Sequence, residues 1–488
     1  MTRGRNRPPG VASRALVWSF GSNIVSRLGT LAIGILLSRI LGPEAFGTYA
    51  VAFVALTAVL SFNDFGVSLA IVRWQRDPRE IAPTVATVSL LASIVIFVAG
   101  FLVAPAYATV MGSPDATNVV RVLLIGILVD GLVAVPAALL QREFRQGTRA
   151  GIDQLNVWLG AAVSIVLAIM GMGAMSLAIG RVVGSGVSGI VFFIVSPHPL
   201  RFGLDRSVLR ELLSFGLPLA GTSLIAFAIG YADQVVVGAV LGPVSLGFYV
   251  LAFNLSSWPV SVFSSPLRAV APAAFSRLQD DPAQMDRAFR SAFRLVAIAA
   301  LPVCFFLAGA AEPIVRFVYG EQWAPAAQAL GWLGLFGALR ILFELSYDFL
   351  VVLRRSGGLL AVQAIWAVVL VAALIGGTLL DGMRGAAIAQ LAVGALVVLP
   401  LYLGMLARSG VRIGPMLLRA GVPLLAALLV LLASLLLSAL LAPPIVPAVL
   451  AGVLTVVLIG GLLLLERASI TELRATWAAG KALETTAA

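Results

Sequence analysis

The stretch "LGPEAFGTYAVAF" (residues 41–53) returns as "LGPVSLGFYVLAF" (residues 241–253), 200 residues later and without a gap. The identical positions are Leu41, Gly42, Pro43, Gly47, Tyr49, Ala52 and Phe53, which recur as Leu241, Gly242, Pro243, Gly247, Tyr249, Ala252 and Phe253. In each copy a Gly-Pro turn separates two apolar stretches. A Leu-Gly-Pro turn is common in membrane proteins, but chance recurrence explains this number of matches poorly. The pattern therefore indicates an internal duplication.

The composition of the chain places both copies in a membrane. Its 488 residues are 60% hydrophobic and only 11% charged, with a mean hydropathy of +1.04. Soluble domains contain about 25% charged residues, and a helix that spans a bilayer needs about 20 apolar residues. Runs of that length recur from end to end, so we expect an all-α integral membrane protein. The first run contains Asn23 and Arg27 and is followed by no small-residue cleavage site, so we expect a retained helix rather than a signal peptide.

Breaks at glycine, proline and charge clusters predict fourteen membrane spans. The expected spans are 15–40, 45–72, 82–104, 119–140, 150–170, 174–196, 210–240, 245–272, 290–311, 326–353, 358–380, 385–407, 416–440 and 446–466. Arginines gather in the N-terminal tail and in every second loop, as at Arg73, Arg76 and Arg79. By the positive-inside rule, this alternation predicts that both termini are cytoplasmic and that the number of spans is even.

The repeat then corresponds to a unit of six helices. Because six is even, both copies have the same orientation and are related by an axis along the membrane normal, as in many transporters. The expected organisation is a basic cytoplasmic tail (1–14), an N-lobe (15–196), a cytoplasmic linker (197–209), a C-lobe (210–407), two further helices (408–466) and a cytoplasmic tail (467–488).

Charged side chains within the spans point to a polar cavity. An arginine at the centre of a membrane helix costs about 2.5–3.5 kcal/mol on insertion scales, so it normally faces a cavity or a partner. Arg27 lies halfway along the first span, on one face with Asn23, Thr30, Gly34 and Ser38. The matching face of the seventh span carries Ser223, Phe227, Gly230, Gln234 and Gly238, without a cation. We expect a central substrate cavity lined by Arg27, Asn23, Thr30, Ser38, Arg181, Gln234 and Arg340.

Intramembrane carboxylates have two interpretations, which the sequence leaves open. The candidates for ion coupling or for structural pairing are Asp64, Asp130, Asp233, Glu344 and Asp348. Arg340, Glu344 and Asp348 share one helix face, and an ion pair between Arg340 and Glu344 explains that spacing equally well. Pairing with cations on neighbouring helices is the better single explanation for Asp64 and Asp130.

Signatures of enzymes and cofactor sites are missing from the sequence. It contains no Walker A, GxSxG, HExxH or CxxC motif, Cys304 is the single cysteine, and the single histidine, His198, lies in a loop. We expect no catalytic residue, no metal and no cofactor. The net charge of +11 comes mainly from loop arginines, so we expect contact with membrane lipids and not with nucleic acid.

Three stretches together resemble the bacterial polysaccharide transporter family. They are "SRLGTLAIGILLSRILGPEAFGTYAVAFVALTAVLSFNDFGVSLAIVR" (26–73), "FGLPLAGTSL" (215–224) and "YGEQWAPAAQAL" (319–330). This family comprises lipid-linked oligosaccharide flippases of the multidrug/oligosaccharidyl-lipid/polysaccharide (MOP) flippase superfamily, and the resemblance covers essentially the whole chain.

The resemblance implies two six-helix lobes that open alternately to either side of the bacterial cytoplasmic membrane, and a substrate made of a polyprenyl pyrophosphate and a short glycan. It implies that Arg27 contacts the pyrophosphate and that the product is a surface polysaccharide of the exopolysaccharide, capsule or O-antigen type. The lipid II flippase branch often carries an Arg-Asp pair where this chain has Ile33 and Gly34, which argues against a peptidoglycan precursor. The implied partners are H⁺ or Na⁺ as coupling ion and a polymerase or export machinery, and we expect a monomer.

Two other functions fit the sequence less well. A multidrug/cation antiporter of the same superfamily would place carboxylates in the first lobe, so Arg27 argues against it. A membrane-embedded glycosyltransferase or polymerase usually needs a long outward loop with catalytic residues, whereas the outward loops of this chain are short.

Overall fold

The computed structural model of the chain describes residues 9–63, 71, 77–276, 278–279, 281–441 and 443–466, with the side chains of residues 9–28 left aside. In this part of the chain the regular structure is helical throughout. The helices are α1 (Pro9–Asn63), α3 (Pro78–Val110), α4 (Ala116–Arg142), α5 (Gln146–Ile169), α6 (Ala174–Val195), α7 (Arg206–Ser276), α8 (Pro282–Gly309), α9 (Ala311–Tyr319), α10 (Ala326–Val352), α11 (Ser356–Val393), α12 (Leu399–Arg408), α13 (Ile413–Leu440) and α14 (Ile445–Leu465). Ten helical stretches of the described residues are long and apolar enough to cross a membrane. The prediction of an all-α integral membrane protein is confirmed.

The duplicated turn has the same backbone conformation in both copies. Helix α1 bends at Gly42 (φ 72°, ψ 174°) and helix α7 bends at Gly242 (φ 80°, ψ −178°). A positive φ is readily available only to glycine, and the proline that follows each glycine lacks the N–H of a helical hydrogen bond. Helix α11 bends similarly at Asp381 and Gly382. Because one helix can thus contain two spans, the number of helices does not test the count of fourteen, which stays a prediction.

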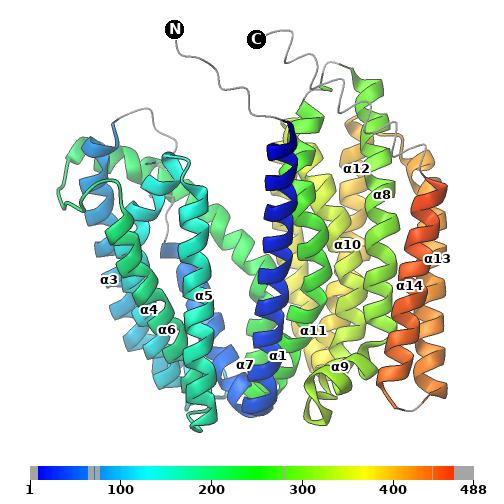
Figure 1. Cartoon of the computed structure of the whole chain (residues 1–488), viewed down its shortest axis with the longest axis horizontal. Coiled ribbons are helices and arrows are strands. Elements are labelled where there is room, and N and C mark those ends of the chain that lie inside the picture. Colours follow the sequence, from blue (N-terminus) through cyan, green and yellow to red (C-terminus); the bar gives the residue numbers. More distant parts are fainter. Residues whose placement is uncertain are drawn as a thin grey trace. The chain divides into compact units, whose positions relative to one another are not determined.

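The chain divides into two compact units, which Figure 1 shows with the sequence coloured from blue to red. Unit 1 consists of Met1–Ala108 and Pro114–Gly221, and unit 2 consists of Thr109–Ser113 and Thr222–Ala488. The expected lobe boundaries, and the superposition of the two lobes, stay predictions.

In unit 1, helices α5 and α6 approach closely because small residues line their interface. A Cβ atom added at Gly180 of α6 would lie 2.5 Å from the carbonyl oxygen of Gly160 on α5, and one added at Gly184 would lie 2.6 Å from that of Asn156. Membrane helices commonly associate through small residues four apart, since these allow van der Waals contact between backbones. Helix α6 also packs on α4. This packing fixes α6, which carries Arg181.

In unit 2, helix α8 packs against α10, α13 and α14, and α10 packs against α11 (Figure 1). A cluster of rings joins three of the helices: Phe289 of α8 lies 4.3 Å from Phe349 of α10, and Phe275 of α7 lies 5.2 Å from Phe349, measured between ring centroids. Buried aromatic pairs of this kind add to the stabilisation from burial alone. The packing holds α10, which carries Arg340, Glu344 and Asp348.

Candidate functional site

The predicted cavity residues of the first span are described only in part. The side chains of Asn23 and Arg27, and residue Asp64, lie outside the described residues, so their roles stay predictions. Thr30 is exposed. Ser38 is 1% exposed, and its hydroxyl donates to the carbonyl oxygens of Gly34 (2.8 Å) and Ile35 (3.0 Å).

Arg181 lies at the centre of a polar and aromatic group that we call the unit 1 cluster (Tyr49, Phe53, Asp130 and Arg181). The exposed Arg181 guanidinium lies 5.4 Å from the centroid of the Phe53 ring, and Phe53 stacks on Tyr49 at 5.9 Å. Arg181 also interacts electrostatically with the Tyr49 hydroxyl and with the carboxylate of Asp130 on α4. Tyr49 and Phe53, two residues of the duplicated stretch, therefore both interact with Arg181.

Arg340 lies in an equivalent setting in unit 2. Its guanidinium carbon is 5.4 Å from the centroid of the Phe253 ring, the same distance as between Arg181 and Phe53. Its Nη1 donates to the Ser257 hydroxyl at 3.2 Å. An arginine thus covers the repeated phenylalanine in each unit.

Asp233 is attracted electrostatically by Arg340 and is 1% exposed, and Gln234 is 3% exposed. The Tyr249 hydroxyl and Gln390 Nε2 both donate to Asp233 Oδ2, at 3.0 and 2.6 Å, and the Gln234 N–H donates to Asp233 Oδ1 at 2.8 Å. Buried carboxylates are stable when donors and a counter-charge surround them. We call Asp233, Tyr249, Phe253, Arg340 and Gln390 the unit 2 cluster.

Each cluster contains one arginine and one aspartate, but they lie at different positions of the predicted repeat. Helices α4 and α10 both contain 27 residues, and Asp130 and Arg340 have the same position in them. Glycines of nearly identical conformation, Gly173 (φ 54°, ψ −135°) and Gly382 (φ 55°, ψ −141°), introduce α6 and the second part of α11. Counted from these glycines, Arg181 and Gln390 are equivalent. Gln390 is not recognisable as a site residue in the sequence, because the identity between the two copies is limited to the stretches around the duplicated turns.

The carboxylates of α10, Glu344 and Asp348, both interact with Arg268 of α7. Glu344 forms an ion pair with Arg268 of α7 at 3.8 Å, whereas Arg340 binds Ser257. Asp348 also interacts electrostatically with Arg268. Its Oδ2 atom is buried and accepts no hydrogen bond from the described residues. Arg340 and Glu344 attract each other electrostatically, but the ion pair of Glu344 within 4 Å is with Arg268.

Next to the unit 2 cluster, unit 2 contains a cavity of about 430 Å³. It is lined by Ala226, Ile229, Gly230, Phe253, Arg268, Phe336, Arg340, Phe343, Glu344, Tyr347, Gln363, Trp366, Gln390 and Tyr402. Aromatic side chains dominate this lining, and charges of both signs are present.

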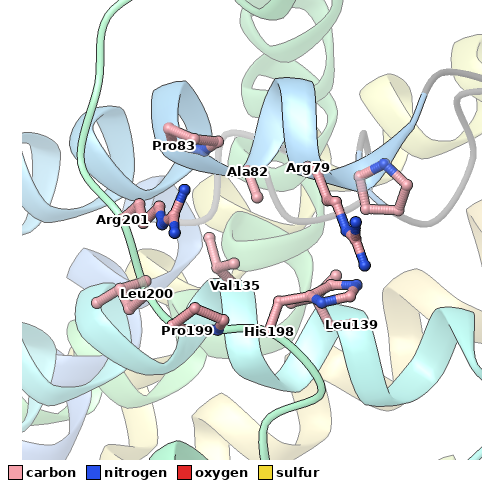
Figure 2. A pocket seen from close by; sticks show the side chains of 10 residues that line it. Arg79, Ala82, Pro83, Val135, Leu139, His198, Pro199, Leu200 and Arg201 are labelled. Atoms are coloured by element: carbon pink, nitrogen blue, oxygen red, sulfur yellow. The ribbon is translucent and has the colours of Figure 1, made fainter.

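Unit 1 contains a smaller cavity of about 230 Å³, shown in Figure 2. Its basic side chains are Arg79 of α3 and, from the segment that precedes α7, His198 and Arg201. The Arg79 side chain points toward His198. The segment is fixed on α3, because Thr87 Oγ1 donates to the carbonyl oxygen of Gly203 at 2.8 Å. No carboxylate is among the lining residues, so this cavity is basic, in contrast to that of unit 2.

Two solved structures share the fold of the chain. The lipid II flippase MurJ, in an inward closed conformation, has a TM-score of 0.76 at 14% identity, over 93% of this chain and 100% of that chain. An inward-facing multidrug resistance MATE family transporter of the MOP superfamily has a TM-score of 0.63 at 20% identity, over 79% and 94%. At these identities the likeness concerns the fold, and it confirms the predicted MOP flippase-like architecture.

Sequence comparison identifies relatives and a family. The chain is 27% identical over 333 residues to the succinoglycan biosynthesis transport protein ExoT of Rhizobium meliloti, with 67% of each chain covered. It is 26% identical over 326 residues to the lipopolysaccharide biosynthesis protein WzxC of Escherichia coli, with 66% of each covered. Residues 36–328 match the family model described as "Polysaccharide biosynthesis protein". The chain therefore belongs to the polysaccharide biosynthesis protein family of multi-pass membrane proteins.

Proposed function

We propose that the protein is a flippase that moves a polyprenyl-pyrophosphate-linked oligosaccharide across the bacterial cytoplasmic membrane for the export of a surface polysaccharide. Family membership, the names of the transport relatives and the MOP-type fold support this proposal. The observation that carries it is the exposed Arg181, which lies within a membrane helix on the Phe53 ring.

The physical problem of this substrate is its charged and hydrated head, which cannot cross hydrocarbon, whereas its lipid tail can stay in the bilayer. An arginine offers a rigid fork of donors that matches phosphate oxygens. In the proposal, Arg181 binds the pyrophosphate together with the predicted contacts of helix α1. The full set of proposed substrate contacts is Arg27, Asn23, Thr30, Ser38, Arg181, Gln234 and Arg340.

Energy for transport is proposed to come from an ion gradient or the membrane potential, because the sequence has no ATP-binding motif. One charge moved across 100 mV supplies about 2.3 kcal/mol. Asp130 is the better coupling candidate among the described carboxylates, since it is exposed and interacts electrostatically with Arg181. The three donors on Asp233 favour a structural role there. We further propose cytoplasmic termini, H⁺ or Na⁺ as coupling ion, and a monomer that works beside a polymerase or export machinery.

The proposal is tested by complementation of a strain that lacks this gene. Arg181→Ala is expected to reduce export of the polysaccharide roughly tenfold or more, because the loss of one charge-assisted contact costs about 1.5–3 kcal/mol. Lipid-linked precursor should accumulate, and Arg181→Lys should restore export only partly. Arg121→Ala is the matched control, because the Arg121 guanidinium also lies over a phenylalanine ring of unit 1, that of Phe101, at 4.4 Å from the ring centroid. This variant should export the polysaccharide normally.

Two results would contradict the proposal. Recovery of export when Arg181→Asp is combined with Asp130→Arg would make Arg181 a structural partner of Asp130 and not a phosphate contact. Normal polysaccharide export in the gene deletion, with loss of organic-cation efflux instead, would identify an antiporter.

A further inference from the structure

We infer that the cavity of unit 2 binds an uncharged sugar ring of the transported glycan. This inference rests on the proposed function and assigns the glycan end of the substrate, whereas Arg181 is assigned to the phosphate end.

The aromatic lining of the cavity suits the apolar C–H face of a sugar ring. Phe343 and Tyr402 stack at 5.4 Å with an interplanar angle of 14°, and Trp366 meets Phe343 edge-on at 5.8 Å and 78°. Phe343 and Tyr402 are each 3% exposed, so they form a rigid buried base. Tyr347 and Trp366 also line the cavity and are partly exposed. They present ring surface on which a sugar can pack without ordering any further side chain.

The polar side chain of Gln363 in the lining matches sugar hydroxyls. Trp366 Nε1 is buried and has no acceptor among the described residues. Because this atom is itself buried, Trp366 offers the cavity the face of its ring and not its N–H group. The amide of Gln363, which also lines the cavity, is half-buried and offers both donor and acceptor atoms. Neighbouring sugar hydroxyls, which can each donate and accept, are able to bind both atoms.

The charges of the cavity favour a neutral ligand over a phosphate. Its two cations face carboxylates: Arg268 forms an ion pair with Glu344, and Arg340 is attracted by Glu344 and by Asp233, which lies outside the lining. Asp348 adds a further negative charge near Arg268. A phosphate would therefore meet no net positive charge. The volume of about 430 Å³ lies within the range of about 300–1,000 Å³ found for small-molecule pockets.

Ligand-observed saturation-transfer NMR on the full chain in lipid nanodiscs tests the assignment. The probes are free maltose and free cellobiose, which carry no phosphate and no lipid. We expect saturation transfer to their ring protons, and about tenfold weaker binding in a double variant, Trp366→Phe with Gln363→Leu. The matched control, Trp332→Phe with Gln328→Leu, removes the same groups from a different cavity of unit 2 and should bind like the wild type.

Several outcomes would overturn the inference. These are an absence of transfer to both disaccharides, equal binding by the two double variants, and displacement of the sugar by equimolar inorganic pyrophosphate or tetraethylammonium. Flipping of lipid-linked oligosaccharides extracted from the source cells, measured in proteoliposomes, separates this inference from the proposed function. If the wild type does not flip these oligosaccharides, the proposed function is refuted. If it flips them normally but binds no disaccharide, only the sugar site is refuted.

Discussion

Replacing Tyr249 by phenylalanine removes one hydroxyl from the unit 2 cluster and leaves the volume of the ring in place. Tyr249 is 0% exposed, and its hydroxyl donates to Asp233 Oδ2 at 3.0 Å. Hydrogen bonds to a charged acceptor contribute about 1.5–3 kcal/mol, and a buried acceptor that loses a donor cannot turn to water. We expect Tyr249→Phe to lower the free energy of unfolding by about 1.5–3 kcal/mol. Gln390 Nε2 and the Gln234 N–H remain as donors and keep the loss within this range.

The measurement is equilibrium unfolding of the purified protein in mixed micelles of increasing SDS content. Tyr249→Phe, Asp233→Asn and the double variant form a cycle whose coupling energy isolates this one hydrogen bond. Tyr107→Phe is the matched control in unit 1, because the Tyr107 hydroxyl donates to an uncharged acceptor, the carbonyl oxygen of Val51, at 2.9 Å. Its expected cost is about 0.5–1.5 kcal/mol. If the free-energy costs of Tyr249→Phe and Asp233→Asn sum to the cost of the double variant within about 0.5 kcal/mol, the reasoning is refuted, because the two sites are then uncoupled.

Three further predictions follow from packing, capping and loop charge. Gly180→Ala should destabilise the protein by about 1–3 kcal/mol through overpacking. Gly186→Ala should not, because a Cβ added there meets no atom within 4 Å. Equal unfolding curves for the two variants would contradict this prediction. Hydrogen bonds from the backbone N–H groups of Gln284 and Ala283, at the start of α8, lower the pKa of Asp281. The Asp281 carboxylate therefore stabilises the protein at a pH above its ordinary pKa, and this stabilisation is lost as the pH falls through the lowered pKa. Asp281→Ala should therefore differ from the wild type in thermal stability at neutral pH but not in strong acid, and a difference independent of pH would exclude the cap. In a Cys304→Ser background, an impermeant thiol reagent should label Asp115→Cys in intact cells and Gln284→Cys only after permeabilisation; the reverse pattern would invert the topology.

The sequence by itself predicted the membrane class, the helical fold and the duplicated turn. These features are local: hydrophobic runs of sufficient length must be helical in a bilayer, since every backbone N–H and C=O group needs a partner there. Gly42 and Gly242 likewise need a positive φ that depends only on their neighbours in the chain. The unusual position of Arg181 and Arg340 within apolar stretches was also visible, because a charged residue in an apolar run can be recognised from the sequence alone.

Only the tertiary structure decided which side chains meet. Helical periodicity gives the face on which Asp233 lies, but nearly every face of these helices is apolar, so the pattern does not say which helix packs there. The Asp233–Gln390 contact joins residues 157 positions apart. Glu344 forms its ion pair with Arg268 of α7 and not with Arg340, which is only four residues away in the sequence, and this choice likewise depends on how α7 lies against α10. In a membrane helix bundle, partners are selected by close packing of complementary surfaces, and that complementarity exists only once the helices are assembled.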